Sequence, residues 1–349
     1  MVGFRRFESI QALRALAALG VVAFHTNGNV LAYGWLPHFF ARVSRFGEIG
    51  VDVFFVISGF IMVFVTHEQP AGIASARSFI AARISRIVPL YWLLTLLFIL
   101  LLVIVPNAFG NAHFNAWNAL TSFVFFPSLN WEGITAPVVG VGWTLNYEMW
   151  FYLVFAIAMC ATRHRVLAAG TFLALTSSLR LLPDGGVVHQ FYTNPIVLEF
   201  VFGCCVGVFY TSGRTIPLPV ALAFLFVTAA AVTLLAPTLT ETNRFLKFGL
   251  LALAVFIVGL SLESRVRWNA WLERIGDSSY SLYLTHVFSV PIAVKVLRMV
   301  DQQHRISGDV ICVVVVLIST VVGLASYRFL ERPLGRLVRG GMGLRKGRA

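Results

Sequence analysis

The sequence predicts an all-α, polytopic transmembrane helical bundle with about ten spans and both termini in the cytoplasm. Its 349 residues are 58% hydrophobic and only 12% charged, and the mean hydropathy is +0.82; soluble globular proteins do not have this composition. Apolar runs long enough to cross a hydrocarbon core of about 30 Å recur along the whole chain. We therefore expect residues 1–330 to form a single transmembrane domain, followed by a basic cytoplasmic tail at 331–349.

Short polar breaks separate the apolar runs and define the expected elements. The ten predicted spans are residues 10–26, 50–66, 88–105, 143–161, 166–182, 192–211, 217–236, 246–263, 278–297 and 308–330. Arginines mark alternate connections, as expected of cytoplasmic loops: Arg5/Arg6, Arg77/Arg83/Arg86, Arg163/Arg165, Arg214, Arg265/Arg267/Arg274 and the tail from Arg332 to Arg348. Residues 117–127 are apolar but too short to span, so we expect an interfacial or re-entrant segment there.

The charge and cysteine content exclude other classes of protein. The formal net charge of +12 comes from short basic clusters between spans and forms no contiguous face, so we expect no nucleic-acid partner. The four cysteines lie in apolar runs without the spacing of a zinc site or a disulfide framework, which favours packing roles and no bound metal.

Arg14 and His25 bracket the apolar stretch of the first span. Eleven residues advance a helix by about 16 Å and turn it by about 1100°, so the two side chains share a face within about 20°. A snorkelling arginine and a histidine at a helix end are the structural alternative. Otherwise, ionisable residues inside a span are candidates for function.

The second span, GVDVFFVISGFIM at 50–62, carries Asp52 near its outer end and Ser58 with Gly59 about halfway across. Small residues at Ser58 and Gly59 favour close helix packing. Asp52 either orients His25 or caps the helix.

Two arginines, Arg83 and Arg86, precede the third span within RISRIVPLYW at 83–92. They are one helical turn apart and face the same way. Positive-inside topology explains them, but arginine also suits bidentate recognition of phosphate.

Glu148 lies inside the fourth span, within VGWTLNYEMWFYLVF at 141–155. A carboxylate at that depth costs several kcal/mol unless it is paired or protonated, so we expect a partner. The neighbouring Trp143 is most simply an interfacial or packing aromatic.

The ninth span begins with GDSSYSLYLTH at 276–286 and places Tyr280, Tyr283 and His286 at intervals of three residues, along one helix stripe. A core histidine with satisfied hydrogen bonds is the structural alternative for His286.

Together these stretches resemble the acyltransferase-3 family of integral membrane acyltransferases. The resemblance covers nearly the whole chain and rests on five stretches in the family's order: Arg14 with His25, FFVISGF at 54–60, RISRIVPLY at 83–91, WTLNYEMWFY at 143–152, and SYSLYLTH with the ERP at 331–333. The short form, with no periplasmic domain expected, is similar to members associated with exopolysaccharide production.

The resemblance implies O-acylation, usually O-acetylation from acetyl-CoA, of a sugar on a surface glycan or lipid-linked saccharide. It also implies a multi-pass protein of the bacterial inner membrane, surrounded by membrane lipids. Some relatives acylate small molecules such as macrolides, which is one alternative. A transporter or flippase of lipid-linked glycan is another, since buried charges also occur in carriers.

On this basis we assign expected roles. Arg83 and Arg86 hold the phosphates of acyl-CoA, and Arg14 steers its pantetheine arm. His25 acts as a general base or carries the acyl group covalently. Glu148 orients or charge-stabilises His25, with Asp52 the weaker candidate. Further candidates for contacts to the bound donor, including the unassigned oxyanion stabiliser, are Ser58, Trp143, Tyr280, Tyr283 and His286.

Overall fold

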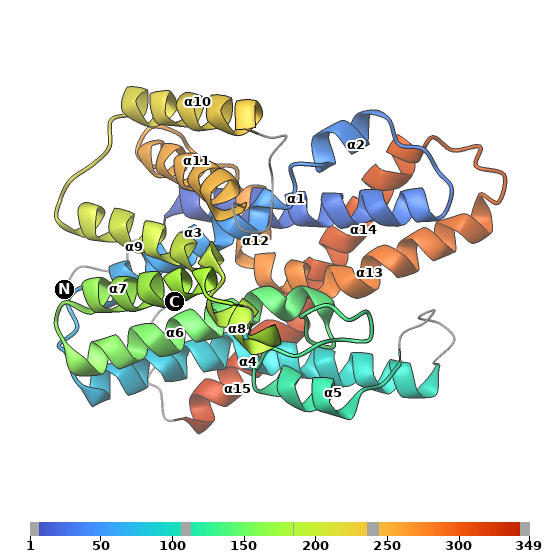
Figure 1. Ribbon diagram of the computed structural model, residues 1–349. Helices are drawn as coiled ribbons and strands as arrows, with labels where there is room; N and C mark the ends of the chain where they lie inside the picture. Colours follow the sequence, from blue (N-terminus) through green and yellow to red (C-terminus); the bar gives the residue numbers. More distant parts are fainter. Residues whose placement is uncertain (1–6, 106–112, 184, 236–243, 343–349) are drawn as a thin grey trace. The chain divides into compact units, whose positions relative to one another are not determined.

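The computed structural model describes residues 7–105, 113–183, 185–235 and 244–342, which are almost entirely helical (Figure 1). The described residues contain no strand beyond an isolated bridge between Leu129 and Thr135. Seven of their helices, or runs of joined helices, are long and apolar enough to cross a membrane, and residues 218–234 and 245–261 form two shorter apolar helices. The predicted all-α polytopic fold is confirmed, while the count of ten and the cytoplasmic termini stay predictions.

A helix corresponds to each predicted span. The helices are α1 (Glu8–Ala32), α3 (Ile49–Thr66), α4 (Ile73–Ile104), α6 (Trp143–Ala161), α7 (Arg165–Ser178), α9 (Leu198–Thr211), α10 (Leu218–Leu235), α11 (Leu250–Ser261), α13 (Ser279–Val300) and α14 (Gly308–Ser326). Five shorter helices connect or follow them: α2 (Phe39–Ser44), α5 (Ala116–Phe123), α8 (Gly186–Tyr192), α12 (Ala270–Asp277) and α15 (Arg332–Gly341).

Two helices are longer than the apolar runs that predicted them. Helix α1 continues to Ala32, so the structural alternative that places His25 at a helix end is wrong. Helix α4 begins at Ile73 rather than near residue 88, which places the predicted phosphate-binding arginines inside it, and it accommodates Pro89. A proline is tolerated where neighbouring groups satisfy the freed carbonyl. Arg5, Arg6 and residues 343–349 of the predicted tail lie outside the described residues.

The chain divides into two compact units, and the division falls within α3. The first unit comprises residues 1–57 and 214–330, and the second comprises residues 58–213 and 331–349.

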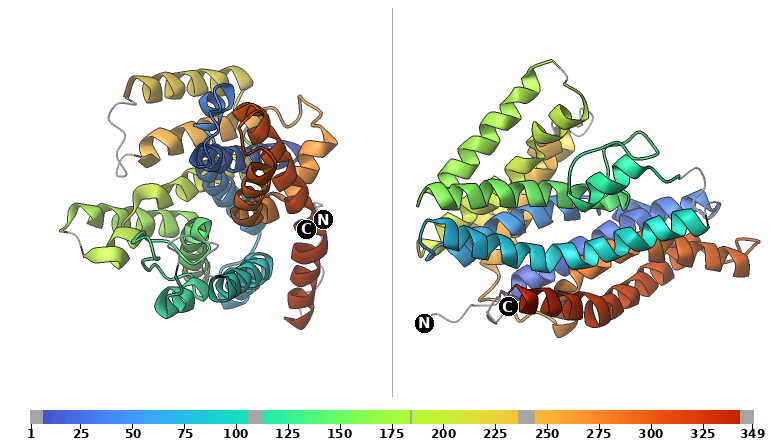
Figure 2. Two further views of the ribbon diagram at one scale, coloured as in Figure 1. Left: turned by 90° about the vertical axis from the view of Figure 1, so that its right-hand side faces the viewer. Right: turned by 90° about the horizontal axis from the view of Figure 1, so that it is seen from below.

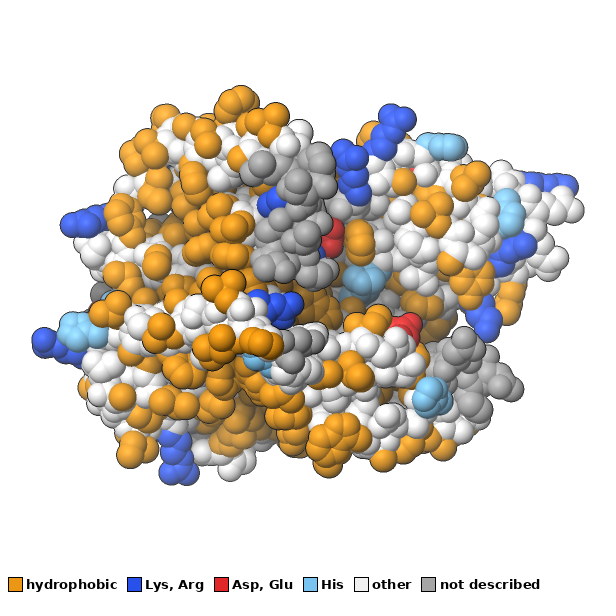
Figure 3. Space-filling model, in the orientation of Figure 1, with side chains coloured by type: hydrophobic (Ala, Val, Ile, Leu, Met, Phe, Trp, Pro, Cys, Tyr) orange, Lys and Arg blue, Asp and Glu red, His pale blue; other side chains and the backbone are white. Residues whose placement is uncertain are grey.

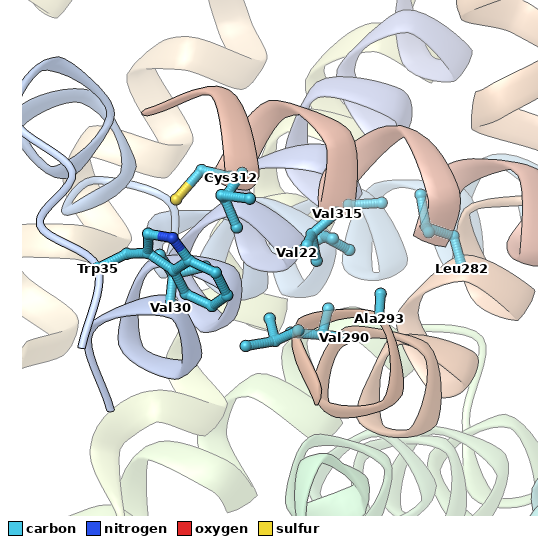
Figure 4. Close-up of a cluster of buried hydrophobic side chains, with 11 residues drawn as sticks. Val22, Val30, Trp35, Leu282, Val290, Ala293, Cys312 and Val315 are labelled. Atoms are coloured by element: carbon cyan, nitrogen blue, oxygen red, sulfur yellow. The ribbon is translucent and has the colours of Figure 1, made fainter. Parts of the chain in front are cut away.

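In the first unit, α1, α13 and α14 pack against one another. Figure 4 shows their buried side chains converging from the three helices and from the loop after α1; the labelled residues are Val22, Val30, Trp35, Leu282, Val290, Ala293, Cys312 and Val315. Glycine allows a close approach here, since a Cβ on Gly323 of α14 would lie 2.8 Å from the Cα of Leu282. This packing holds α1 and α13 in one register.

In the second unit, α4 runs alongside α6 (Figure 2), α6 contacts α7, and α7 contacts α9. Gly59 on α3 meets the backbone of α9, because a Cβ there would lie 1.9 Å from the carbonyl oxygen of Phe200. The packing role expected of this glycine is confirmed. Phe151 of α6 stacks on the Phe200 ring with 4.5 Å between centroids.

Both units expose apolar side chains of the kind that face lipid. Figure 3 shows hydrophobic side chains gathered over α10 and along α5. On α10 the exposed set is Val220, Leu222, Phe226, Val227 and Leu234, and on α4 it includes Leu93, Leu96, Leu97, Leu100, Val103 and Ile104. Exposed apolar surface of this extent would be an aggregation hazard in water and is expected in a bilayer.

The connection between α1 and α3 is tied to the loop between α13 and α14. Trp35 donates its indole N–H to a carboxylate oxygen of Asp301 at 3.1 Å, and Asp309 accepts backbone N–H groups at the start of α2. These bonds fix the segment that follows the His25 end of α1.

Candidate active site

Arg14 and His25 lie on the face of α1 that meets α13, as their spacing predicts. The Arg14 guanidinium donates to the Ser279 hydroxyl at 2.9 Å. Farther along α1, the His25 ring lies 4.9 Å, centre to centre, from the ring of His286. Two consecutive contacts to one neighbouring helix define a polar stripe between α1 and α13.

A backbone hydrogen bond fixes the protonation pattern of His25. Its Nδ1 lies 3.0 Å from the carbonyl oxygen of Val21. A carbonyl oxygen only accepts, so Nδ1 carries the hydrogen and Nε2 keeps a lone pair in the neutral ring. The side chain is half-buried. A positioned lone pair on a partly accessible imidazole is what a general base or a nucleophile requires.

His286 has the same local arrangement one helix away. Its Nδ1 donates to the carbonyl oxygen of Tyr283 at 2.5 Å, and the side chain is 1% exposed. The buried Tyr283 ring lies 5.8 Å from the imidazole and 6.2 Å from the ring of Phe54. Tyr280, one turn earlier on α13, is half-buried.

Asp52 is fully buried in the first turn of α3 and forms an ion pair with Arg244 at 3.0 Å. The same guanidinium binds Glu48 at 3.0 Å. The expected role of Asp52 toward His25 stays a prediction. Sequence reasoning missed Arg244 and Glu48. Arg244 lies 192 positions after Asp52 and 196 positions after Glu48, and no local spacing links residues that far apart.

In the second unit, Glu148 has the partners that its burial requires. The Ser58 hydroxyl donates to its Oε1 at 3.0 Å, and the Tyr152 hydroxyl donates to the same atom. The Arg83 guanidinium lies 6.0 Å from the centre of the Tyr152 ring and 5.9 Å from that of Phe79. Arg83, Tyr152, Glu148 and Ser58 therefore form one polar cluster, contributed by α3, α4 and α6.

The remaining predicted residues of the second unit lie at the edges of this cluster. Arg86 is half-buried one turn after Arg83 on α4. Between them, Ser85 accepts a hydrogen bond from Arg339 of α15 at 3.3 Å. Trp143 begins α6 and packs edge-on against Tyr147, with ring centres 5.9 Å apart.

The predicted residues thus fall into two sets. The first unit holds Arg14, His25, Asp52, Tyr280, Tyr283 and His286, and the second holds Ser58, Arg83, Arg86, Trp143 and Glu148. Within the part of the chain that the structure describes, no three His, Cys, Asp or Glu side chains are grouped as metal ligands.

Known proteins resemble the chain over most of its length. Residues 7–326 match the acyltransferase domain that defines the acyltransferase-3 family. The chain is 37% identical over 308 residues to the exopolysaccharide production protein ExoZ of Rhizobium meliloti, which covers 87% of this chain and 91% of that protein.

More distant relatives are longer proteins. The peptidoglycan O-acetyltransferase OatA of Listeria monocytogenes is 24% identical over 365 residues, and the O-acetyltransferase OatA of Staphylococcus aureus is 23% identical over 372 residues. These alignments cover 93% and 95% of the chain but only 55% and 57% of the relatives. No solved structure matches the chain. Because the family match extends over nearly all of the helical fold and its motifs, the chain belongs to the acyltransferase-3 family and is a membrane acyltransferase.

Proposed function

We propose that the protein transfers an acyl group, acetyl in the simplest case, from acetyl-CoA to a sugar hydroxyl of an exopolysaccharide at the bacterial inner membrane. The observation that carries the proposal is the geometry of the His25 imidazole. Its Nδ1 donates a hydrogen bond to the Val21 carbonyl oxygen, so its Nε2 keeps a lone pair. The 37% identity with an exopolysaccharide production protein supports the class of acceptor.

In the first form of the reaction, His25 is a general base. Its Nε2 takes the proton of the sugar hydroxyl while the sugar oxygen attacks the thioester carbonyl. The new C–O bond forms, the C–S bond breaks, and the CoA thiolate takes the proton from the imidazolium. The products are the sugar ester and CoA thiol, and His25 is neutral again.

In the second form, His25 is a nucleophile. Its Nε2 attacks the thioester carbonyl, the C–S bond breaks, and CoA leaves as the thiolate. The acyl-imidazolium then passes the acyl group to the sugar hydroxyl, whose proton goes to the thiolate, so the sugar ester, CoA thiol and neutral His25 remain. Both forms need the same lone pair, so the geometry of His25 serves either.

Donor recognition is the proposed role of the arginines. Arg83 and Arg86 offer guanidinium groups suited to the CoA phosphates, and Arg14 contacts the pantetheine arm. Glu148, held by two hydroxyl donors, is proposed to support the charge that develops during transfer. The chain belongs to an acyltransferase family, and no specific observation favours the alternative of a transporter.

The test compares the O-acyl content of surface polysaccharide, by NMR, in cells with the protein, without it, and with His25→Ala at equal abundance. We expect acyl signals only with the wild-type protein. The matched control is His67→Ala, which changes an exposed histidine at the end of α3 and keeps the acyl signals. Identical spectra with and without the protein would contradict a polysaccharide acceptor and would favour a small-molecule acceptor such as a macrolide.

A further inference from the structure

We propose that His286 is a positioning residue for acyl transfer, which accepts a hydrogen bond from the His25 imidazolium that forms during the reaction. The inference rests on the proposed function of His25 and adds a second imidazole to it.

The two rings lie close together, and each has one nitrogen held by the backbone. Each Nδ1 is held by a backbone carbonyl of its own helix, Val21 for His25 and Tyr283 for His286. Both Nε2 atoms therefore carry lone pairs in the resting state, and two lone pairs cannot bond to each other. With 4.9 Å between ring centres, one proton delivered to His25 Nε2 can join the rings directly or through one water.

The burial of His286 supports this role. The side chain is 1% exposed, and its Nε2 makes no hydrogen bond to any of the described residues. A buried acceptor without a partner costs free energy, whereas an apolar side chain at this position would cost none. The turns of α13 before and after His286 carry Leu282 and Val290, which belong to the apolar core. The imidazole is therefore better explained by a partner that appears during the reaction than by packing.

The chemical step balances without a further reactant. The sugar proton moves to His25 Nε2 as the C–O bond forms and the C–S bond breaks. The resulting imidazolium donates to His286 Nε2, which stabilises the positive charge among apolar side chains. The CoA thiolate then removes the proton, and both rings return to their neutral forms.

The test separates hydrogen bonding from ring packing. His286→Phe keeps a ring of similar shape but has no acceptor, whereas His286→Gln keeps an acceptor and loses the ring. Initial rates are measured with purified protein in proteoliposomes, acetyl-CoA, and the de-O-acetylated polysaccharide of cells that carry the protein. We expect Phe to lower kcat by about 100-fold, with the KM for acetyl-CoA unchanged and Gln within about tenfold of wild type.

Ser289→Ala is the matched control. Ser289 lies one turn after His286 on α13 and is buried, but it donates to Ser319 at 2.9 Å instead, so its loss should leave kcat unchanged. If His286→Phe does not fold, His286→Met fills the space without an equivalent acceptor.

Wild-type rates with Phe, or equal losses with Phe and Gln in folded protein, would overturn the role of His286 and leave the proposed function intact. Absence of acetyl transfer by the wild-type protein in the same assay would instead contradict the proposed function, so the two failures are distinguishable.

Discussion

At the scale of single residues, several polar side chains inside the helices are held by a specific partner. Glu148 illustrates this best, because two hydroxyl groups, from Ser58 and Tyr152, donate to one of its oxygens. Removing the acceptor leaves both donors in a largely apolar environment.

We predict that Glu148→Ala destabilises the second unit by about 1–3 kcal/mol, since two hydroxyls lose their acceptor. Glu148→Gln retains an acceptor oxygen and should fold normally while transferring acyl groups more slowly. Unfolding can be followed with a thiol-reactive dye once the exposed Cys160 and Cys205 are replaced by serine, because Cys204 is a free, buried thiol of the second unit. Glu68→Gln, at an exposed carboxylate, is the control; full activity in Glu148→Gln would exclude a role for the charge.

For Arg83 we predict a defect in donor binding rather than in chemistry. Arg83→Ala removes a guanidinium expected to contact CoA phosphate and should raise the KM for acetyl-CoA about tenfold, with kcat retained. The difference from wild type should shrink with a donor that lacks the 3′-phosphate if that phosphate is the one bound. Arg77→Ala changes an exposed arginine of the same helix and serves as control; an unchanged KM in Arg83→Ala would remove Arg83 from the donor site.

The residues themselves could be predicted, but their partners could not. A charge in an apolar run identified Arg14 and Glu148, and the rule that buried charge needs a partner followed from physical chemistry. The partners come from 265 and 90 residues away, at Ser279 and Ser58. Such distances carry no local periodicity. The contact of His25 with His286 escaped prediction for the same reason.

At the scale of elements, hydropathy located the apolar part of each helix and missed the polar ends. Helix α6 begins and ends where the sequence predicts, whereas α1 and α4 extend beyond their apolar runs. Polar residues continue α1 beyond its apolar run, and one of them, Asn29, donates its side-chain amide to the His25 carbonyl oxygen one turn earlier in the same helix. Helices α12 and α15 were not predicted, because they are short and amphipathic and a test for long apolar runs does not detect them.

Arg244 lies just before the helical turn Phe245–Gly249 that leads into α11, and its ion pairs connect this segment to the start of α3. We predict that these ion pairs stabilise the fold. Arg244→Ala leaves the fully buried Asp52 carboxylate without its cation, which should cost about 3–5 kcal/mol in the free energy of unfolding. The double variant with Asp52→Asn should recover part of that loss, since it removes the uncompensated charge. Glu48→Gln, at the more exposed partner, should cost much less; a single Arg244→Ala as stable as wild type would contradict the role.

Asp301 should make the loop between α13 and α14 sensitive to acid. Burial disfavours its charged form, but hydrogen bonds from the Ile306 and Arg305 amides and from Trp35 outweigh burial and lower its pKa. A carboxyl group whose pKa is lowered by folding stabilises the folded protein at pH values above its pKa in the unfolded chain, about 3.9. That stability is lost as the pH falls through the pKa of the folded state.

We therefore predict that the melting temperature of the wild type falls more than that of Asp301→Asn between pH 5 and acid pH below about 3.9. Asn cannot change its charge, so the difference between the two proteins isolates Asp301. Parallel pH curves for the two proteins would show that Asp301 does not contribute.

At the scale of the whole molecule, composition predicted the polytopic helical class and the order of five motifs predicted the family, and both are confirmed. The grouping of the predicted residues into two sets, one in each unit, was not foreseen. Hydropathy orders helices along the chain but says nothing about which of them share a core. That information lies in contacts such as those of Gly59 and Gly323, where the absence of a side chain allows a close approach.

The chemistry we propose for the molecule depends on the His25 lone pair, and one rate comparison tests it directly. Wild type and His25→Gln are purified, reconstituted in proteoliposomes at equal amounts of folded protein, and given acetyl-CoA with de-O-acetylated polysaccharide. We predict that His25→Gln lowers the initial rate of acetyl transfer by at least about 100-fold. A folded His25→Gln protein that transfers acetyl groups at the wild-type rate would contradict the proposal.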